Sequence, residues 1–416
     1  MKFYLKNIFK IPMLLVFLLI SVFYALPALG KQSEIDRYAI VTAVGIDKVE
    51  EEGSENKYEI SLLTFIPIAD QTYKEKYKVI SAQGRNISEA IDFAGLHIGR
   101  EVGLSHVRLV VLNVDLLQED ATNYLDYLSR SETIAPSTKL ITTNATAKEF
   151  LHAAERLDNE SSIKVSDLII FNDDYVYSSD SSFENFYQGR MGPTKVSLMP
   201  FIRLDKGDSK GILVMVGDNQ QSSSGQQSST STEEGKEEIS NNGETVVLKN
   251  AKQKMILDGR DVKKINLVKG NFRTGSIEIF DVNCGNYKHA DLTFEILDKN
   301  IKYKVVFQNG YPIVCINNKI SLTLSEVKQG GEVVEENVEY FSFSEGIKDE
   351  IEKKIRSSVR DAIEIMRENQ TDIVDFYTIM YNSDKRAFLK FLDSLDDKED
   401  YLNHVIFKIG INIYTK

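Results

Sequence analysis

Histidines, cysteines and acidic residues are the side chains of this 416-residue chain with the greatest capacity for chemistry. His97 and Glu101 are four positions apart, a spacing that could place two metal ligands on one helix face. A third ligand would have to come from elsewhere, so a surface histidine beside a helical glutamate is the simpler interpretation. The other histidines follow no metal-binding spacing: His106, His152, His289 and His404. Because His106 opens an apolar run, we expect it to be structural.

The acidic residues do not single out a site. The stretch "FNDDYVYSSD" groups Asp173, Asp174 and Asp180, but its spacing is not that of a calcium loop, and a solvated loop is expected. With 62 acidic residues, some pair of carboxylates is always present, and none is marked out for glycoside hydrolysis. The chain has no G-x-S-x-G elbow, P-loop or G-x-G-x-x-G motif. We therefore expect no catalytic residues, no cofactor and no metal ion.

Two cysteines, Cys284 and Cys315, are too few for a disulfide framework. One disulfide is chemically allowed if the chain lies outside the cytoplasm. We favour the other interpretation, in which both are free thiols at half-buried strand positions.

Composition limits the class of partner. The formal net charge is −12, which argues against nucleic acid and against an anionic membrane surface as the main partner. Hydrophobic residues make up 42% of the chain and charged residues 27%, as in ordinary globular proteins. The length is sufficient for two or three domains.

The first thirty residues have the layout of an export signal. Lys2, Lys6 and Lys10 precede an uncharged run, "IPMLLVFLLISVFYALPALG", which ends in small residues. The run is also about long enough to span a bilayer, which takes roughly 20 apolar residues. We therefore predict that residues 1–30 are a signal peptide or a membrane anchor, and that the rest of the chain is exported.

Residues 31–192 are predicted to form an N-terminal mixed α/β domain. Apolar, β-branched runs predict strands over 37–46, 57–67, 77–84, 106–113 and 137–144. Helical periodicity predicts helices over 86–99, 116–130 and 146–158, the last opened by a Thr146 cap. Residues 171–192 are expected to be a loop.

Residues 193–288 are predicted to form a middle, strand-rich domain. Short strands are expected over 193–204 and 210–218, and again over 246–270, where they could pair with the earlier ones. Between them, residues 219–244 contain no aliphatic side chain except Ile239, so this segment is predicted to be a disordered insertion.

Residues 289–416 are predicted to form a C-terminal domain with a helix packed on a mostly antiparallel sheet. Alternating segments predict strands over 290–296, 302–308 and 319–327. A long amphipathic helix is expected over 345–369, followed by a shorter one at 384–395 and a final strand at 403–414. The predicted fold class is therefore α+β, with three mixed α/β domains.

Several stretches, in order, resemble the Ger(x)C spore germination proteins, the C subunits of nutrient germinant receptors. They include "EIDRYAIVTAVGIDK", "SEAIDFAGLHIGREVGLSHVRLVVLNVDLL", "AKQKMILDGRDVKKINLVKGNFRTGSIEI" and "IEKKIRSSVRDAIEIMRENQTDIVDF" followed by "VIFKIGINIY". Each motif is an apolar pattern with a few polar residues, so the resemblance depends on the order and spacing of the motifs.

The resemblance implies a non-enzymatic, three-domain receptor subunit on the outer face of the spore inner membrane. Its expected partners are a transporter-like integral membrane subunit and a second membrane-associated subunit. An exported small-molecule (nutrient) binding protein is the alternative, and it would need a pocket between domains. A secreted hydrolase is a third reading, which would need a clustered set of acids or histidines.

One position departs from the family pattern. The family carries a lipid-bearing cysteine where this chain has Lys31, and a thioether-linked lipid requires a thiol. Anchoring must then come from an uncut helix over residues 11–29, from partner proteins, or be absent, and we favour the uncut helix.

Overall fold

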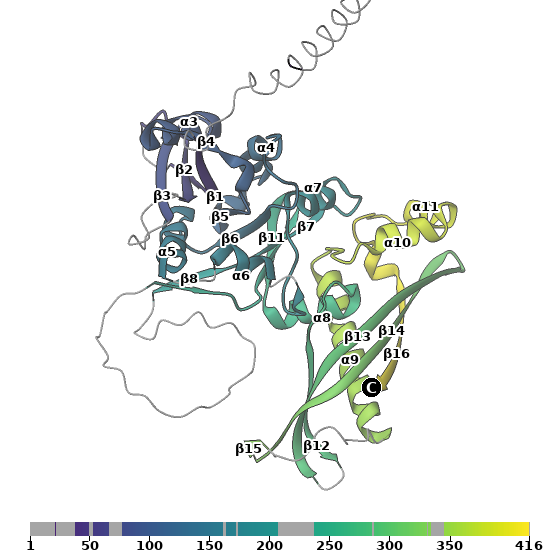
Figure 1. The fold of residues 1–416 in the computed structure, drawn as a ribbon. Coiled ribbons are helices and arrows are strands. Elements are labelled where there is room, and N and C mark those ends of the chain that lie inside the picture. The colour runs from purple at the N-terminus through teal and green to yellow at the C-terminus, as the bar shows by residue number, and fades with distance from the viewer. Residues whose placement is uncertain are drawn as a thin grey trace, which may run out of the picture.

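The computed structural model contains helices and sheets in several layers, which confirms the α+β class (Figure 1). It describes residue 21 and residues 38–49, 53–65, 77–160, 164–171, 174–206, 237–284, 287–330, 332–333 and 345–415. The predicted leader, the predicted strand at 210–218 and residues 219–236 of the predicted insertion lie outside these ranges, apart from residue 21.

The first sheet combines an antiparallel half with a parallel half. Its strands are β1 (Tyr38–Lys48), β2 (Tyr58–Phe65), β3 (Tyr77–Gly84), β4 (Glu101–Gly103), β5 (Leu109–Asn113) and β6 (Lys139–Thr143). The order is β3-β2-β1-β5-β6, with β4 beside the start of β1. Strands β1, β2 and β3 pair antiparallel, whereas β1, β5 and β6 run parallel. The parallel strands therefore start at one common end of the sheet.

Helices cover both faces of this sheet. One face packs against α3 (Ile87–Ile98) and α4 (Thr122–Ser129), and the other against α5 (Ala147–Glu160) and α6 (Val165–Phe171). The predicted Thr146 cap is confirmed: its hydroxyl accepts from the Glu149 amide at 3.1 Å, and the Glu149 carboxylate accepts from the Thr146 amide.

The prediction of a loop over 171–192 is wrong for its second half. Helix α7 (Phe183–Met191) begins there, capped by Ser182, whose hydroxyl accepts from the Asn185 amide. Phe183 and Phe186 are buried in the core shared with α3 and α4. The segment "SSFENFYQGRM" is polar, and two aromatic anchors plus a serine cap suffice to fix the helix against the sheet.

A three-stranded sheet follows, in the order β11-β10-β7, formed by β7 (Val196–Pro200), β10 (Thr245–Lys249) and β11 (Lys252–Leu257). The predicted pairing across the insertion is confirmed, because β10 pairs with β7. Met199 and Val246 pack into a core with the first sheet, whereas Val247 packs with the C-terminal part. This small sheet thus lies between two cores.

Two predictions for this region need correction. Residues 259–269 form helix α8 rather than a strand, since Asp258 caps it and Gly270 ends it in the left-handed conformation. The end of the predicted disordered insertion is ordered, because β9 (Glu237–Ser240) pairs with β8 (Arg203–Lys206). Ile239, the single aliphatic residue of that stretch, is buried and provides the physical reason.

The last sheet is built on one long hairpin. Strands β13 (Tyr287–Gln308) and β14 (Tyr311–Gln329) are joined by a turn in which Asn309 and Gly310 both have positive φ. The two strands predicted at 290–296 and 302–308 are one continuous strand. Flanking strands are β12 (Ser276–Cys284), β15 (Glu332–Val333) and β16 (Ile406–Thr415), which runs parallel to β14.

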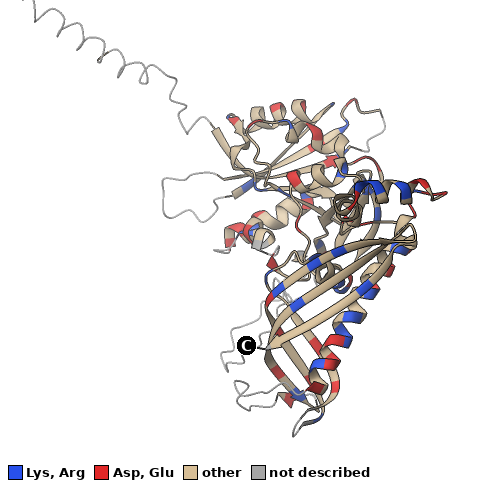
Figure 2. Cartoon of the chain, turned by 90° about the vertical axis from the view of Figure 1, so that its right-hand side faces the viewer, with Lys and Arg blue, Asp and Glu red and all other residues tan. Residues whose placement is uncertain are grey.

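One face of this sheet is covered by α9 (Glu345–Glu368), with α10 (Phe376–Ser383), α11 (Lys385–Asp393) and the short helix η7 (Tyr401–His404) at one end (Figures 1 and 2). The amphipathic helix predicted over 345–369 is confirmed by α9, whose apolar face is buried: Ile347, Ile351, Ile355, Val359 and Ile363. The other face of the sheet is open. The predicted domain boundaries at 192/193 and 288/289 stay a prediction.

Candidate functional site

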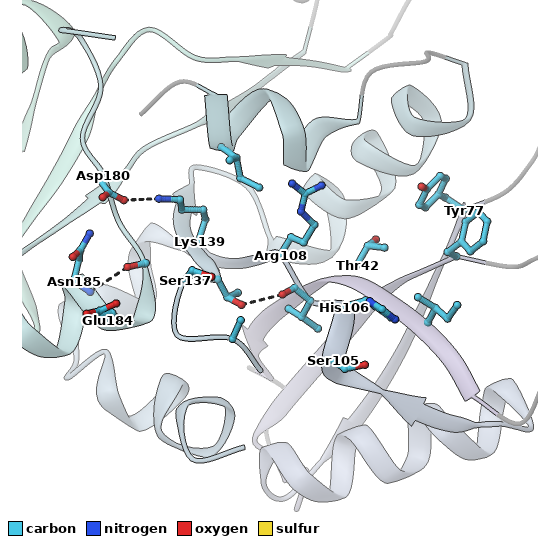
Figure 3. A pocket seen from close by; sticks show the side chains of 17 residues that line it. Thr42, Tyr77, Ser105, His106, Arg108, Ser137, Lys139, Asp180, Glu184 and Asn185 are labelled. Carbon is cyan, nitrogen blue, oxygen red and sulfur yellow. Dashed lines mark hydrogen bonds and ion pairs between the residues drawn. The ribbon is translucent and has the colours of Figure 1, made fainter. Parts of the chain in front are cut away.

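A cavity of about 870 Å³ opens at the end of the first sheet where β1, β5 and β6 begin (Figure 3). Its wall includes Thr42 of β1, His106 and Arg108 before β5, and Lys139 at the start of β6. In open α/β sheets ligands usually bind at the carboxyl ends of the strands. Here the cavity lies at the opposite, amino end.

Two cationic side chains in the wall of this cavity are paired in salt bridges. The Lys139 ammonium pairs with Asp180, and the Arg108 guanidinium pairs with Asp167 of α6. His106 is exposed and has no hydrogen-bond partner among the described residues. The expectation that His106 is a satisfied structural residue is therefore wrong: the chain leaves β4 in a short 3-10 turn, Leu104–His106, which turns the ring outward.

The start of α7 borders the cavity but is not a vacant anion site. Its first amides are all engaged: Phe183 donates to the Thr138 carbonyl, Glu184 to the Pro136 carbonyl, and Asn185 to the Ser182 hydroxyl. A helix start binds an anion through amides that lack partners. The cavity therefore offers a histidine, hydroxyls and paired charges, which suits a small polar molecule better than a phosphate.

The carboxyl end of the same sheet is closed. Asp47, at the end of β1, is buried and accepts hydrogen bonds from the amides of Ala147 (2.8 Å) and Lys148 (2.9 Å). Burial raises the pKa of the Asp47 carboxyl, partly opposed by these two bonds. The edge that usually holds a ligand is thus filled by a carboxylate that caps α5.

The residues examined for metal binding do not come together. His97 lies in the last turn of α3, which ends at Gly99 before Glu101 begins β4, so the two do not share a helix face. The His97 ring lies 3.3 Å from the Ser81 carbonyl. Asp174 pairs with Arg273, and Asp173 lies outside the described residues. Within the described ranges, no group of three potential metal ligands occurs.

Cys315 is a free, half-buried thiol on β14, as we expected. It lies opposite Lys304 of β13, whereas the Cys284 backbone lies opposite Tyr287. These β13 positions are about 55 Å apart along the strand, far beyond the reach of a disulfide. The side chain of Cys284 lies outside the described residues.

Two protein families match this chain, one over its N-terminal part and one over its C-terminal part. Residues 31–204 match the spore germination protein N-terminal domain, and residues 242–413 match the family described as spore germination B3/GerAC-like, C-terminal. The chain is 21% identical to spore germination protein KC of Bacillus subtilis (strain 168), over 97% of this chain and 95% of that protein.

The fold also resembles a solved structure. The crystal structure of the GerBC protein aligns with a TM-score of 0.51 and 15% identity, covering 90% of this chain and 98% of that one. At 15% identity the structural similarity supports only a shared fold, whereas the two domain matches identify the family. The chain therefore belongs to the GerC family of spore germination proteins, the C subunits of germinant receptors.

Proposed function

We propose that this chain is a non-enzymatic subunit of a nutrient germinant receptor, and that it acts through contacts with other receptor subunits. The observation that carries the proposal is the match of both domain families in order, 31–204 and then 242–413. Together these ranges take in nearly all of the described residues. The proposed partners are a transporter-like integral membrane subunit and a second membrane-associated subunit.

We place the protein outside the cell membrane, on the outer face of the spore inner membrane. Among the described residues, no helix has the length and apolar character needed to cross a bilayer. The proposed anchor is the uncharged run over residues 11–29, since Lys31 cannot carry a thioether-linked lipid.

Anchoring is tested by fractionating sporulating cells and measuring the intact mass of the recovered protein. Membrane-bound protein that retains the residues around Met1 is expected. A variant lacking residues 1–30 serves as the mobility standard and as the soluble control. Native protein that is soluble and begins near Lys31 would contradict the anchor and shift the weight to a released binding protein.

The receptor role is tested by deleting the gene and measuring germination of the spores. Loss of the response to one nutrient, with a normal response to a trigger that bypasses nutrient sensing, is expected. Restoration by the natural gene is the control. Normal responses to every nutrient, in spores that carry no second copy of the family, would contradict the proposal.

A second candidate function is binding of a small nutrient molecule, favoured by the cavity at the amino end of the first sheet. The test is calorimetric titration of nutrients against the full chain and against His106→Ala. A matched control is Met191→Ala, since Met191 is 81% exposed and is not among the residues that line the cavity. Binding that is lost in the first variant and kept in the second supports this function, and no heat with any nutrient contradicts it.

A further inference from the structure

The open face of the C-terminal sheet carries a basic surface on an acidic protein. On this face, opposite residues form rows across β13, β14 and β16, such as Lys304–Cys315–Lys408 and Lys302–Asn317–Gly410. Lys319 lies in the next row, between Asn300 and Asn412. All four lysines are exposed. Figure 2 shows blue bands of Lys and Arg on the long strands of this sheet.

Within the described part of the chain, none of Lys302, Lys304, Lys319 and Lys408 forms an ion pair. The first acidic side chain on this face of β13 is Asp298, opposite Ser321. The chain as a whole has 62 acidic and 50 basic residues. Adjacent like charges on a sheet disfavour folding, so a face of this kind fits an anionic partner.

An apolar row ends the basic surface, next to the hairpin turn. Val306, Ile313 and Ile406 lie opposite one another across the three strands. Val306 and Ile406 are 46% and 50% exposed, whereas Ile313 between them is buried, at 8% exposed. Tyr311, at the turn, is 50% exposed and makes an edge contact with Phe391 of α11. We name the exposed side chains Val306, Tyr311 and Ile406 the apolar tip.

Helix α11 adds cations beside this tip. Its inner face packs Phe388, Phe391 and Leu392 into the core. Its outer positions expose Lys385, Arg386, Leu389 and Lys390. The apolar tip is therefore flanked by positive charge on two elements.

We propose that this surface docks on an anionic lipid bilayer, with the apolar tip at the level of the acyl chains and the lysines at the headgroups. Protein interfaces place apolar residues at the centre and are depleted in lysine, whereas here the apolar residues lie at one end and the lysines follow behind. Lysine stems can extend toward headgroups while the tip is buried, and tyrosine is common at that level. The inference rests on the proposed membrane location and gives the described part of the chain a defined orientation there. The net charge of −12 argues against an anionic membrane as the main partner, and the docking proposed here depends on the local group of lysines instead.

The absence of tryptophan from the sequence allows a direct test with the full chain reconstituted in vesicles. Tyr311→Trp places the single tryptophan at the tip and keeps an aromatic ring against Phe391. Tyr414→Trp, on the same face but at the other end of β16, is the matched reporter. The readout is quenching by brominated lipids in vesicles of neutral lipid with and without an anionic lipid.

Strong quenching of the Tyr311→Trp variant in anionic vesicles is expected, with little quenching of the Tyr414→Trp variant. Adding Lys304→Gln and Lys408→Gln to the Tyr311→Trp variant should reduce the docking equilibrium constant obtained from the quenching, on the order of tenfold. Each lysine near an anionic surface contributes to binding. Lys353→Gln with Lys354→Gln, on α9, makes the same charge change away from the face and should have no effect. Equal quenching of both reporters, or no quenching of either in anionic vesicles, overturns the proposal. An acidic protein would then be the partner of the lysine face. Because this readout is independent of germination, it can fail while the receptor role stands.

Discussion

The Asp47 carboxylate lies 2.8 Å from the backbone nitrogen of Ala147, a residue one hundred positions later in the chain. The bond fixes the first turn of α5 to the end of β1, and a second bond to Lys148 completes the cap. The "VGIDK" stretch that contributes to the family resemblance is therefore structural. It closes the carboxyl end of the sheet.

Asp47→Ala is expected to destabilise the fold by about 1–2 kcal/mol, because two amides of α5 lose their acceptor while remaining in a buried region. Urea unfolding of the full chain measures the change. Asp115→Ala, at an exposed position of the same domain, is the control and should shift the midpoint little. An unchanged midpoint for Asp47→Ala would show that water replaces the cap.

Gly45 allows α5 to approach β1 closely. A Cβ atom at this position would lie 2.9 Å from the Ala147 Cβ and 3.0 Å from the Leu151 Cδ1. Gly45→Ala is therefore expected to cost about 1–3 kcal/mol through overpacking.

The matched control for this substitution is Gly346→Ala. Nothing lies within 4 Å of a Cβ there, and the residue is in the first turn of α9. Alanine favours the helix, so a gain of up to about 1 kcal/mol is expected. Thermal unfolding compares the two, and equal effects would contradict the close approach.

Asp372 is the clearest pH-dependent group. It is 4% exposed, accepts from the Tyr377 amide and the Tyr401 hydroxyl, and has one oxygen without a partner among the described residues. Burial raises its pKa to about 6, with a smaller contribution from Asp375. Because folding raises this pKa, the protonated form is favoured in the folded state, and stability from this group is gained as pH falls through 6 toward 4.

Asp372→Asn removes this titration. We compare the free energy of unfolding of the variant with that of the natural chain at each pH. The advantage of the variant should be larger near neutral pH than near pH 4, by up to about 3 kcal/mol. Urea unfolding of both proteins between pH 4 and 7.5 gives the difference at each pH, in which the other acids cancel. A difference that is constant across this range would mean that Asp372 does not titrate there.

Removal of residues 219–234 should change the unfolding free energy by less than about 1 kcal/mol, since loop-closure entropy varies slowly with length. Ile239→Ser, a few residues beyond, should cost more because Ile239 is buried in the core with α5 and α6. Calorimetry of the two variants tests this contrast. A large loss on deletion would show that the insertion packs against the rest of the protein.

Local sequence patterns, such as hydrophobic periodicity and capping residues, predicted some elements correctly. The amphipathic helix α9, the Thr146 cap and the final strand β16 were all predictable, because each depends on residues close in sequence. Helix α7 was missed because its sequence is polar and its anchors Phe183 and Phe186 pack against elements distant in the chain. Helix α8 was missed although its Asp258 cap, its apolar residues at helical spacing and Gly270 carry a local signal.

The cavity had no sequence signal. Lys139 and Asp180, which meet in its wall, are 41 positions apart, and His106 looked like the first residue of a strand. The charge pattern was equally hidden: the net charge of −12 argued against an anionic membrane as the main partner, and only strand pairing brings the lysines onto one face.

The sequence by itself determined the α+β class and the family resemblance, and the export signal and its anchor are predictions from the same residues, with Lys31 in place of the family's cysteine. Only the tertiary structure decided that Asp47 closes one end of the sheet while a cavity opens at the other. It also decided that lysines from β13, β14 and β16 share one face. The physical reason is that cross-strand register and helix docking join residues far apart in sequence, and composition and periodicity record only local order.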